Sequence, residues 1–236
     1  EIIDTSIKML KTSGFKKATI KIGNFKLFEL LIKKLPIVTR WQNRLLKFYW
    51  NEKYFSQLLK RLESNLDIDP FVVSADHKIY LKMKKDNPNK MIAGRSYKEI
   101  LSRYENKLQN PRITKTGKYS AKVIKEFLKI KSSLKDAPEK LNKFYKKYNL
   151  NIFVGKDFFP VTNFNQNDLK YEFSACNGRG KEVEYYDSFN FSIDVKLKNK
   201  TKTYIAGGRY NNMAQKSLGL KKIPAVGAAI NLGVYE

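Results

Sequence analysis

The most informative part of the chain is Tyr204-Ile205-Ala206-Gly207-Gly208-Arg209-Tyr210, together with Pro224-Ala225-Val226-Gly227-Ala228-Ala229-Ile230. Two adjacent glycines follow an apolar run, and a second glycine-bearing apolar segment comes soon after. Because glycine has no Cβ, such a pair lets the backbone approach a ligand or another strand closely. We therefore expect a strand that lies either at a binding site or hard against a neighbouring strand.

The residues before this segment alternate with a period of two, as in half-buried strands. The alternation predicts strands over residues 152–154, 169–175, 189–195 and 203–206. Asn177-Gly178-Arg179-Gly180 predicts a turn, and the charged residues 196–202 predict a hairpin turn. Sequential strands joined by short turns indicate an antiparallel sheet.

The N-terminal part of the chain has a different pattern. Residues 1–13 have helical spacing and end at Gly14, and residues 18–22 read as a strand. Residues 25–150 have a helical pattern interrupted by loops at 86–89 and 110–111, with a capping-box pattern at Ser96 and Glu99 and a helix start at Asp136. We therefore expect three parts: 1–24, the end of the first half of a sheet core; 25–150, a helical insert; and 151–236, the second half of the core.

Composition narrows the class of protein. The chain has 236 residues with 42% hydrophobic residues, enough for a buried core, and no apolar run reaches the roughly 20 residues of a membrane helix. The single cysteine, Cys176, excludes an internal disulfide and favours a reducing cytoplasm. Because the chain starts at Glu1, we interpret it as a fragment of a longer protein.

The net charge of +25 suggests a nucleic-acid partner. The positive residues are mostly lysines, scattered singly or in pairs, whereas arginine, which forks onto phosphates, is scarce. Scattered lysines favour solvated faces over a nucleic-acid surface.

Residues that carry chemistry are sparse. His77 is the only histidine, and no second histidine or nucleophile motif accompanies it. Cys176 lies in an alternating segment, where a small apolar role is usual. Neither a phosphate-binding loop nor a dinucleotide fingerprint is present. We expect no catalytic residues, no metal and no cofactor.

Two stretches resemble histidyl-tRNA synthetases, which are class II enzymes. Ala206 to Tyr210 matches the family's Ala-Gly-Gly-Arg-Tyr, followed by Asn211 where the family has Asp. Residues 181–188 stand at the family's Arg-Gly-Leu-Asp-Tyr-Tyr-Thr-Gly, and Tyr185 and Tyr186 are kept. The family's catalytic Arg falls on Lys181, unless Arg179 takes its place from a shifted turn. The ATP-binding Arg of motif 3 falls on Val234, so loss of that cation argues against aminoacylation.

A third stretch points to non-catalytic relatives of the synthetases. Ile92-Ala93-Gly94-Arg95-Ser96, with Glu99, Ile100 and Arg103, is similar to regulatory subunits of ATP phosphoribosyltransferase. This resemblance implies an α+β fold: a class II synthetase-like antiparallel sheet with flanking helices, interrupted by a helical insert. It also implies a subunit without chemistry of its own, which permits phosphoribosyl transfer and mediates feedback inhibition by histidine in histidine biosynthesis.

The implied partners are the short-form catalytic subunit, a second copy of the chain in a synthetase-like dimer, and histidine as effector. The implied ligand site is a vestigial histidine pocket, and the residues assigned to it are Tyr185, Tyr186, Tyr204, Gly207, Gly208 and Arg209. For the tyrosines and glycines, packing in the sheet is the alternative. The alternative functions are a divergent histidyl-tRNA synthetase fragment and a synthetase-like nucleic-acid-binding module.

Overall fold

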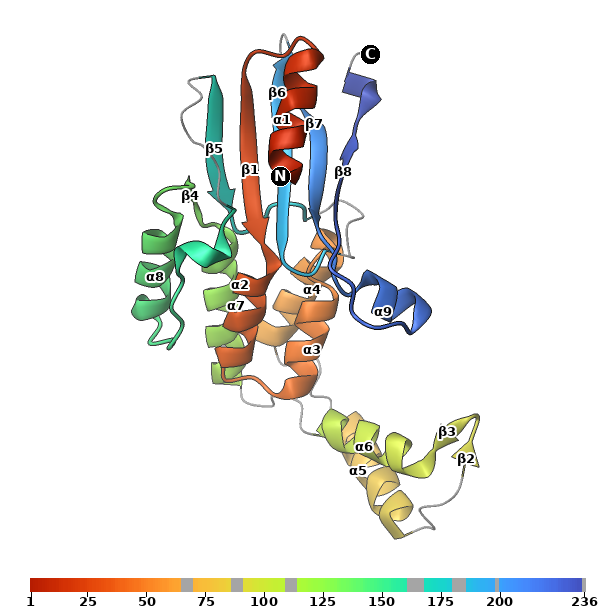
Figure 1. The fold of residues 1–236 in the computed structure, drawn as a ribbon. Coiled ribbons are helices and arrows are strands. Elements are labelled where there is room, and N and C mark those ends of the chain that lie inside the picture. The colour runs from red at the N-terminus through yellow and green to blue at the C-terminus, as the bar shows by residue number, and fades with distance from the viewer. Residues whose placement is uncertain are drawn as a thin grey trace. The chain divides into compact units, whose positions relative to one another are not determined.

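The computed structural model describes residues 1–64, 70–85, 91–108, 114–160, 168–179, 186–197 and 200–234. The chain forms two compact units. One contains the sheet and combines Glu1–Lys34 with Ile124–Glu236, and the other is Leu35–Val123. The helix α7 (Thr114–Leu128) crosses the boundary between them (Figure 1).

The first unit is built on a six-stranded sheet with the strand order β4-β5-β1-β6-β7-β8 (Figure 1). Every neighbouring pair is antiparallel except β1 and β5, which are parallel. The strands are β1 (Ala18–Asn24), β4 (Lys131–Ser133), β5 (Leu169–Ser174), β6 (Phe189–Leu197), β7 (Lys200–Arg209) and β8 (Val226–Ile230).

The predicted α+β fold, a central sheet with flanking helices, is confirmed, but the sheet is mixed. Parallel neighbours need a long crossover, and the chain supplies one because all the residues between β1 and β5 intervene. Strand β4 was not expected, since residues 131–133 lie in the segment predicted to be helical.

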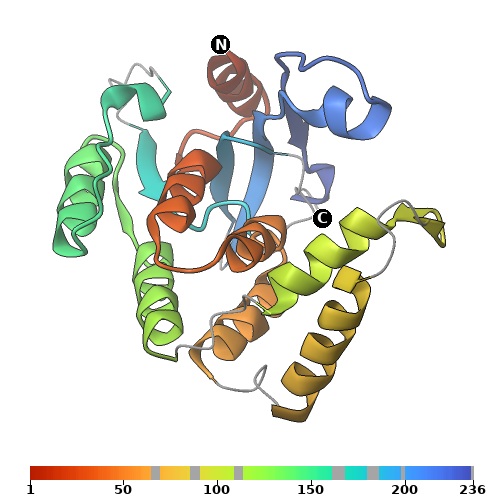
Figure 2. The same ribbon diagram turned by 90° about the horizontal axis from the view of Figure 1, so that it is seen from below.

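Helix α1 (Ile2–Thr12) runs across one face of the sheet (Figures 1 and 2). Its apolar residues Ile3, Ile7 and Leu10 recur at helical spacing and are at most 4% exposed. Burying each such side chain stabilises the fold by roughly 1.5–3 kcal/mol. The helix ends where predicted, just before Gly14 at φ +84°.

The remaining helices of the first unit follow the strands. Helix α2 (Phe25–Lys34) continues directly from β1, and its residues Leu27, Phe28, Leu31 and Ile32 are buried. Helix α8 (Ala137–Lys147) begins at the predicted Asp136 with a proline in its first turn. The short helix α9 (Met213–Leu218) lies between β7 and β8.

The described part of the second unit consists of helices and a short hairpin. It contains α3 (Thr39–Lys47), α4 (Glu52–Glu63), α5 (Pro70–Lys85) and α6 (Tyr97–Leu108), and the two-residue strands β2 (Met91–Ile92) and β3 (Arg95–Ser96). The predicted cap of α6 is present, because the Ser96 hydroxyl accepts a hydrogen bond of 3.2 Å from the Glu99 N–H. Its α4 and α7 helices approach closely: a Cβ on Gly117 would lie 2.2 Å from the Leu62 carbonyl oxygen.

The compact units divide at 34/35 and 123/124, with α2 and α8 in the unit that holds the sheet. The division into 1–24, a helical insert 25–150 and 151–236 stays a prediction. The strand predicted at 152–154 does not form. Instead the Asn142 side chain bonds both the N–H and the carbonyl of Val154, at 2.8 and 3.0 Å, so this backbone is satisfied without a sheet partner.

Candidate functional site

The glycine pair Gly207 and Gly208 lies in the C-terminal part of β7. At both positions neighbouring atoms occupy the place where a Cβ atom would lie. A Cβ on Gly207 would lie 2.6 Å from the Gly227 carbonyl oxygen and 2.6 Å from Cε1 of Phe191. A Cβ on Gly208 would lie 2.7 Å from Cδ1 of Tyr186. Real Cβ atoms do not approach other atoms this closely, so neither position accepts a side chain without movement.

The five described residues among those assigned to the vestigial histidine pocket do not all face one cavity. Successive side chains in a strand point to opposite faces of the sheet. Gly208 therefore faces the buried ring of Tyr186, whereas Gly207 faces Phe191 and shares its face with Arg209. Tyr185 lies outside the described residues.

Tyr204 is held away from the other predicted site residues. It is 2% exposed, its hydroxyl shares a hydrogen bond of 2.5 Å with the Ser13 hydroxyl, and its ring lies 5.0 Å from that of Phe15. These contacts tie β7 to the segment that follows α1. Of the five assigned residues that the structure describes, Arg209 is the one that lines a cleft of this unit.

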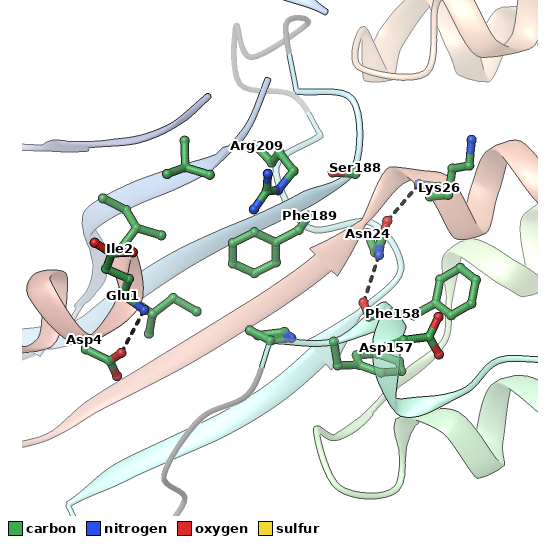
Figure 3. A pocket seen from close by; sticks show the side chains of 14 residues that line it. Glu1, Ile2, Asp4, Asn24, Lys26, Asp157, Phe158, Ser188, Phe189 and Arg209 are labelled. Atoms are coloured by element: carbon green, nitrogen blue, oxygen red, sulfur yellow. Dashed lines mark hydrogen bonds and ion pairs between the residues drawn. The ribbon is translucent and has the colours of Figure 1, made fainter. Parts of the chain in front are cut away.

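This cleft has a volume of about 570 Å³, within the range of about 300–1,000 Å³ typical of small-molecule sites. Figure 3 shows the Arg209 guanidinium beside the ring of Phe189, with Asn24 to the right of both in this view. The N-terminal turn of α1, the segment 157–160, and the ends of β1, β7 and β8 complete the wall. Its charged side chains are Glu1, Asp4, Lys26, Asp157 and Arg209.

Asn24 fixes one side of the cleft. Its amide nitrogen donates to the Phe158 carbonyl at 2.8 Å, and its amide oxygen accepts from the Lys26 N–H at 2.9 Å (Figure 3). One side chain thus joins the end of β1, the start of α2 and the short 3₁₀ helix Lys156–Phe158. The sequence analysis did not single out Asn24, although an Asn that ends a strand and precedes a helix is a recognised signal for a local cap.

Lys26 belongs to a small ionic cluster. Glu29 accepts from Lys26 at 2.8 Å and from Lys33 at 2.6 Å. Burial tends to raise the pKa of Glu29, but the hydrogen bonds and charges of the two lysines outweigh that effect and lower the pKa overall. The Lys26 side chain is therefore oriented along α2 at the mouth of the cleft.

The loop that follows Arg209 is closely bonded. The Asn211 amide oxygen accepts from the Arg209 guanidinium at 3.4 Å and from the Ala225 N–H at 3.1 Å. Asp187 accepts from the Asn212 N–H at 2.7 Å, and its own N–H donates to the Arg209 carbonyl. Asn211 thus forms hydrogen bonds with the guanidinium and with the backbone just before β8, so it orients the arginine.

The opposite face of the sheet carries a buried polar network. The Asn177 amide donates to Asn190 Oδ1 at 2.8 Å and to the Lys21 carbonyl at 3.3 Å, and Ser192 donates to Asn177 Oδ1 at 3.3 Å. Beside it, Lys21 pairs with Asp194 at 2.8 Å. A satisfied network of this kind fixes the turn after β5 against β1 and β6.

The cleft offers binding groups of both signs. Arg209 and Lys26 are suited to a carboxylate or phosphate, and Asp157 to a cation. Elsewhere, His77 is exposed on α5, and the Cys176 sulfur lies 3.3 Å from the Ser174 hydroxyl. Within the described parts of the chain, no group of three or more His, Cys, Asp or Glu residues is placed to hold a metal ion. No described helix is long and apolar enough to cross a membrane.

The fold and the cleft define an α+β protein with a central mixed sheet, flanking helices and a small-ligand cleft at the ends of its strands. Comparison with curated sequences then gives more specific relatives. The chain is similar to proteins named ATP phosphoribosyltransferase regulatory subunit: 28% identical over 92% of the chain in Allorhizobium ampelinum, 27% over 94% in Rhizobium rhizogenes, and 24% over 94% in Sinorhizobium medicae. The resemblance inferred from the sequence motifs is thereby confirmed.

The chain spans 62% of the length of these curated relatives. No protein-family model matches it. Two solved structures align with nearly the whole chain. A histidine–tRNA ligase subunit from Alicyclobacillus acidocaldarius has a TM-score of 0.39 and 16% identity, with 97% of this chain and 56% of that one aligned. An ATP phosphoribosyltransferase regulatory subunit/histidyl-tRNA synthetase from Bacillus halodurans has a TM-score of 0.41 and 14% identity, with 99% and 47% aligned.

Proposed function

We propose that the protein is a non-catalytic regulatory subunit of ATP phosphoribosyltransferase. The observation that carries this proposal is the similarity to proteins of that name over at least 92% of the chain, through both compact units. The partner is then the short-form catalytic subunit, and the reaction is the condensation of ATP with phosphoribosyl pyrophosphate, at the start of histidine biosynthesis in the cytoplasm. A synthetase-like dimer of the chain forms part of this proposal.

The effector in this proposal is histidine, bound in the cleft beside Arg209. A planar guanidinium binds a carboxylate through two parallel hydrogen bonds. Among the residues that the structure describes, the Arg209 guanidinium makes one side-chain hydrogen bond, a long one to Asn211. Asp157, on the facing segment, suits the ammonium group of an amino acid. For histidine to inhibit, it must bind one arrangement of the assembly more tightly than another.

The Tyr186 face of the sheet is the other place at which histidine might be sought, because Tyr185, Tyr186 and Gly208 are the residues assigned to the vestigial pocket there. The described part of that face is filled: Tyr186 is 6% exposed and contacts the Gly208 position directly. This packing favours the Arg209 cleft as the effector site.

The test uses the full-length protein with the short-form catalytic subunit. We expect phosphoribosyl transfer only when both are present, and its inhibition by histidine. Arg209→Ala should retain activation but weaken inhibition by about tenfold or more, while Lys16→Gln, an exposed charge outside the cleft, should behave as wild type. Absence of activation would overturn the regulatory assignment.

The two alternative functions give different results in the same preparation. A divergent histidyl-tRNA synthetase would catalyse histidine-dependent exchange of pyrophosphate into ATP. A nucleic-acid-binding module would bind RNA with an affinity that falls steeply with salt. We expect neither result.

A further inference from the structure

The hairpin of the second unit forms an apolar hollow that the proposed function does not use. Strands β2 and β3 are joined by Ala93 and Gly94, at φ +49° and +75°. Two successive positive φ angles are the signature of a tight two-residue hairpin turn, which fixes the relative position of the strands. Figures 1 and 2 show this hairpin at one end of the side-by-side helices α5 and α6.

The hollow lies between the hairpin and the first turns of α6. Ile92, Ala93 and Arg95 line it from the hairpin, and Ile100, Arg103 and Tyr104 from the helix. Arg103 and Tyr104 follow Ile100 by three and four positions, which places them on the same face of the helix as Ile100. The volume of about 480 Å³ is enough for a large side chain with its adjoining backbone.

The hairpin is anchored to the helix, so the hollow does not depend on a loose loop. The Ser96 hydroxyl, at the end of β3, caps α6 through the Glu99 N–H. Tyr97, the first residue of the helix, is 4% exposed. Both contacts hold the chain where the hairpin meets the helix.

Two guanidinium groups border this apolar surface. Arg103 donates to Glu99 at 3.0 Å, a surface pair in which both side chains are at least half exposed. The Arg95 side chain makes no hydrogen bond or ion pair with any residue that the structure describes, and it is exposed. An exposed ion pair contributes little to the stability of the fold. The Arg103 guanidinium can therefore leave Glu99 and bind an incoming carboxylate with little loss of free energy.

The apolar surface extends beyond the hollow. Met91 is 62% exposed and Ile92 is 41% exposed, next to the two arginines. A free phosphate or a small anion would leave this surface uncovered. Tyr104 gives the hollow one ring on which a base could stack. The exposed Met91 and Ile92 offer nucleic acid no such contact, and the exposed carboxylates of Glu99 and Glu105 would repel its phosphates.

We propose that this hollow binds an acidic peptide segment of a protein partner. An apolar side chain of the segment enters between Ile92 and Ile100, and flanking carboxylates bind Arg95 and Arg103. Charge complementarity selects the segment, because the arginines form planar two-bond contacts with carboxylates, and the apolar contact with Met91 and Ile92 selects a peptide over a free anion. This proposal does not depend on the regulatory function.

The experiment measures binding of the full-length protein to a fluorescent synthetic peptide in which glutamate and leucine alternate. We expect the double variant Arg95→Gln/Arg103→Gln to weaken binding by about tenfold or more. The matched control is Lys16→Gln/Lys17→Gln, which removes the same charge from exposed positions of the other unit and should leave binding unchanged. Both pairs are exposed, and circular dichroism checks that the variants fold.

Two further peptides separate the contributions. Replacing leucine by serine should weaken binding about tenfold, as should replacing glutamate by glutamine. An equal loss in the arginine and lysine variants would reduce the effect to net charge and overturn the proposal. So would a single-stranded RNA that binds more tightly than the peptide and loses its affinity in the arginine variant.

Discussion

The hydroxyl groups of Ser13 and Tyr204 lie 2.5 Å apart and share a hydrogen bond across 191 positions of sequence. Ser13 is the C-cap of α1, and Tyr204 is in the middle of β7. Tyr204 is 2% exposed, so water does not reach its hydroxyl, and Ser13 supplies a hydrogen-bond partner within the protein. The bond therefore fixes the C-terminal end of α1 on the sheet.

The first prediction concerns this bond. Ser13→Ala leaves the buried tyrosine hydroxyl without this partner, so we expect it to lower the free energy of unfolding by about 1–3 kcal/mol. Tyr204→Phe removes the buried group itself and should cost less, about 0.5–1.5 kcal/mol. Urea unfolding of the wild type, both single variants and the double variant measures this. Additive effects in the double variant would show that the two hydroxyls are not coupled.

The second prediction concerns the glycine facing Tyr186. A Cβ at position 208 must displace either the Tyr186 ring or the Phe189 carbonyl, which would lie 2.8 Å away. We expect Gly208→Ala to destabilise the protein by about 1–3 kcal/mol.

Its control is the double variant Gly208→Ala/Tyr186→Ala, which removes the ring that the new methyl group meets. The double variant should be less destabilised than the sum of its single variants, with a coupling of at least about 0.5 kcal/mol. Unfolding free energies that simply add would mean that the ring is not what excludes a side chain from position 208.

The third prediction concerns acid. The lysine pair lowers the pKa of Glu29, so the folded state favours the charged carboxylate more than the unfolded state does. This stability is present above the unfolded pKa, near the ordinary value of 4.5, and is lost as the pH falls through the lower folded pKa. Glu29→Gln should therefore be less stable than wild type near neutral pH, by a few tenths to about 1 kcal/mol, and should approach it in acid. A difference independent of pH would contradict this origin.

Local structure followed from the sequence because short-range spacing determines it. The spacing of Ile3, Ile7 and Leu10 predicted α1, and the alternation through Phe191 and Ile193 predicted β6. The parallel pairing of β1 with β5 did not follow, because periodicity specifies that a strand forms and not which strand it joins. The prediction of a strand at 152–154 was wrong for a similar reason, because the Val154 backbone is bonded by the Asn142 side chain from α8 and not by another strand.

The candidate site was predictable only in part. The alternation of side chains along a strand is enough to place Gly207 and Gly208 on opposite faces of the sheet, so the two glycines cannot line the same cavity. The cleft itself draws Asn24, Lys26, Asp157 and Arg209 from separate segments. Their meeting depends on sheet order, which no motif in the sequence specifies.

The last prediction concerns alkaline unfolding. The Tyr145 hydroxyl donates to the Leu27 carbonyl at 3.1 Å inside the first unit, and the side chain is fully buried. Burial raises the pKa of Tyr145 far above the value of about 10 found in unfolded chains. Above about pH 10 the unfolded chain therefore loses this proton while the folded protein keeps it, and Tyr145 contributes a fall in the free energy of unfolding of about 1.4 kcal/mol per pH unit.

Tyr145→Phe should remove this contribution to the slope, although it also loses the bond to Leu27 and is less stable at neutral pH. Urea unfolding at a series of pH values above about 9 measures the slopes of the two proteins, and a Tyr145→Phe slope equal to that of the wild type would show that another group controls the alkaline transition.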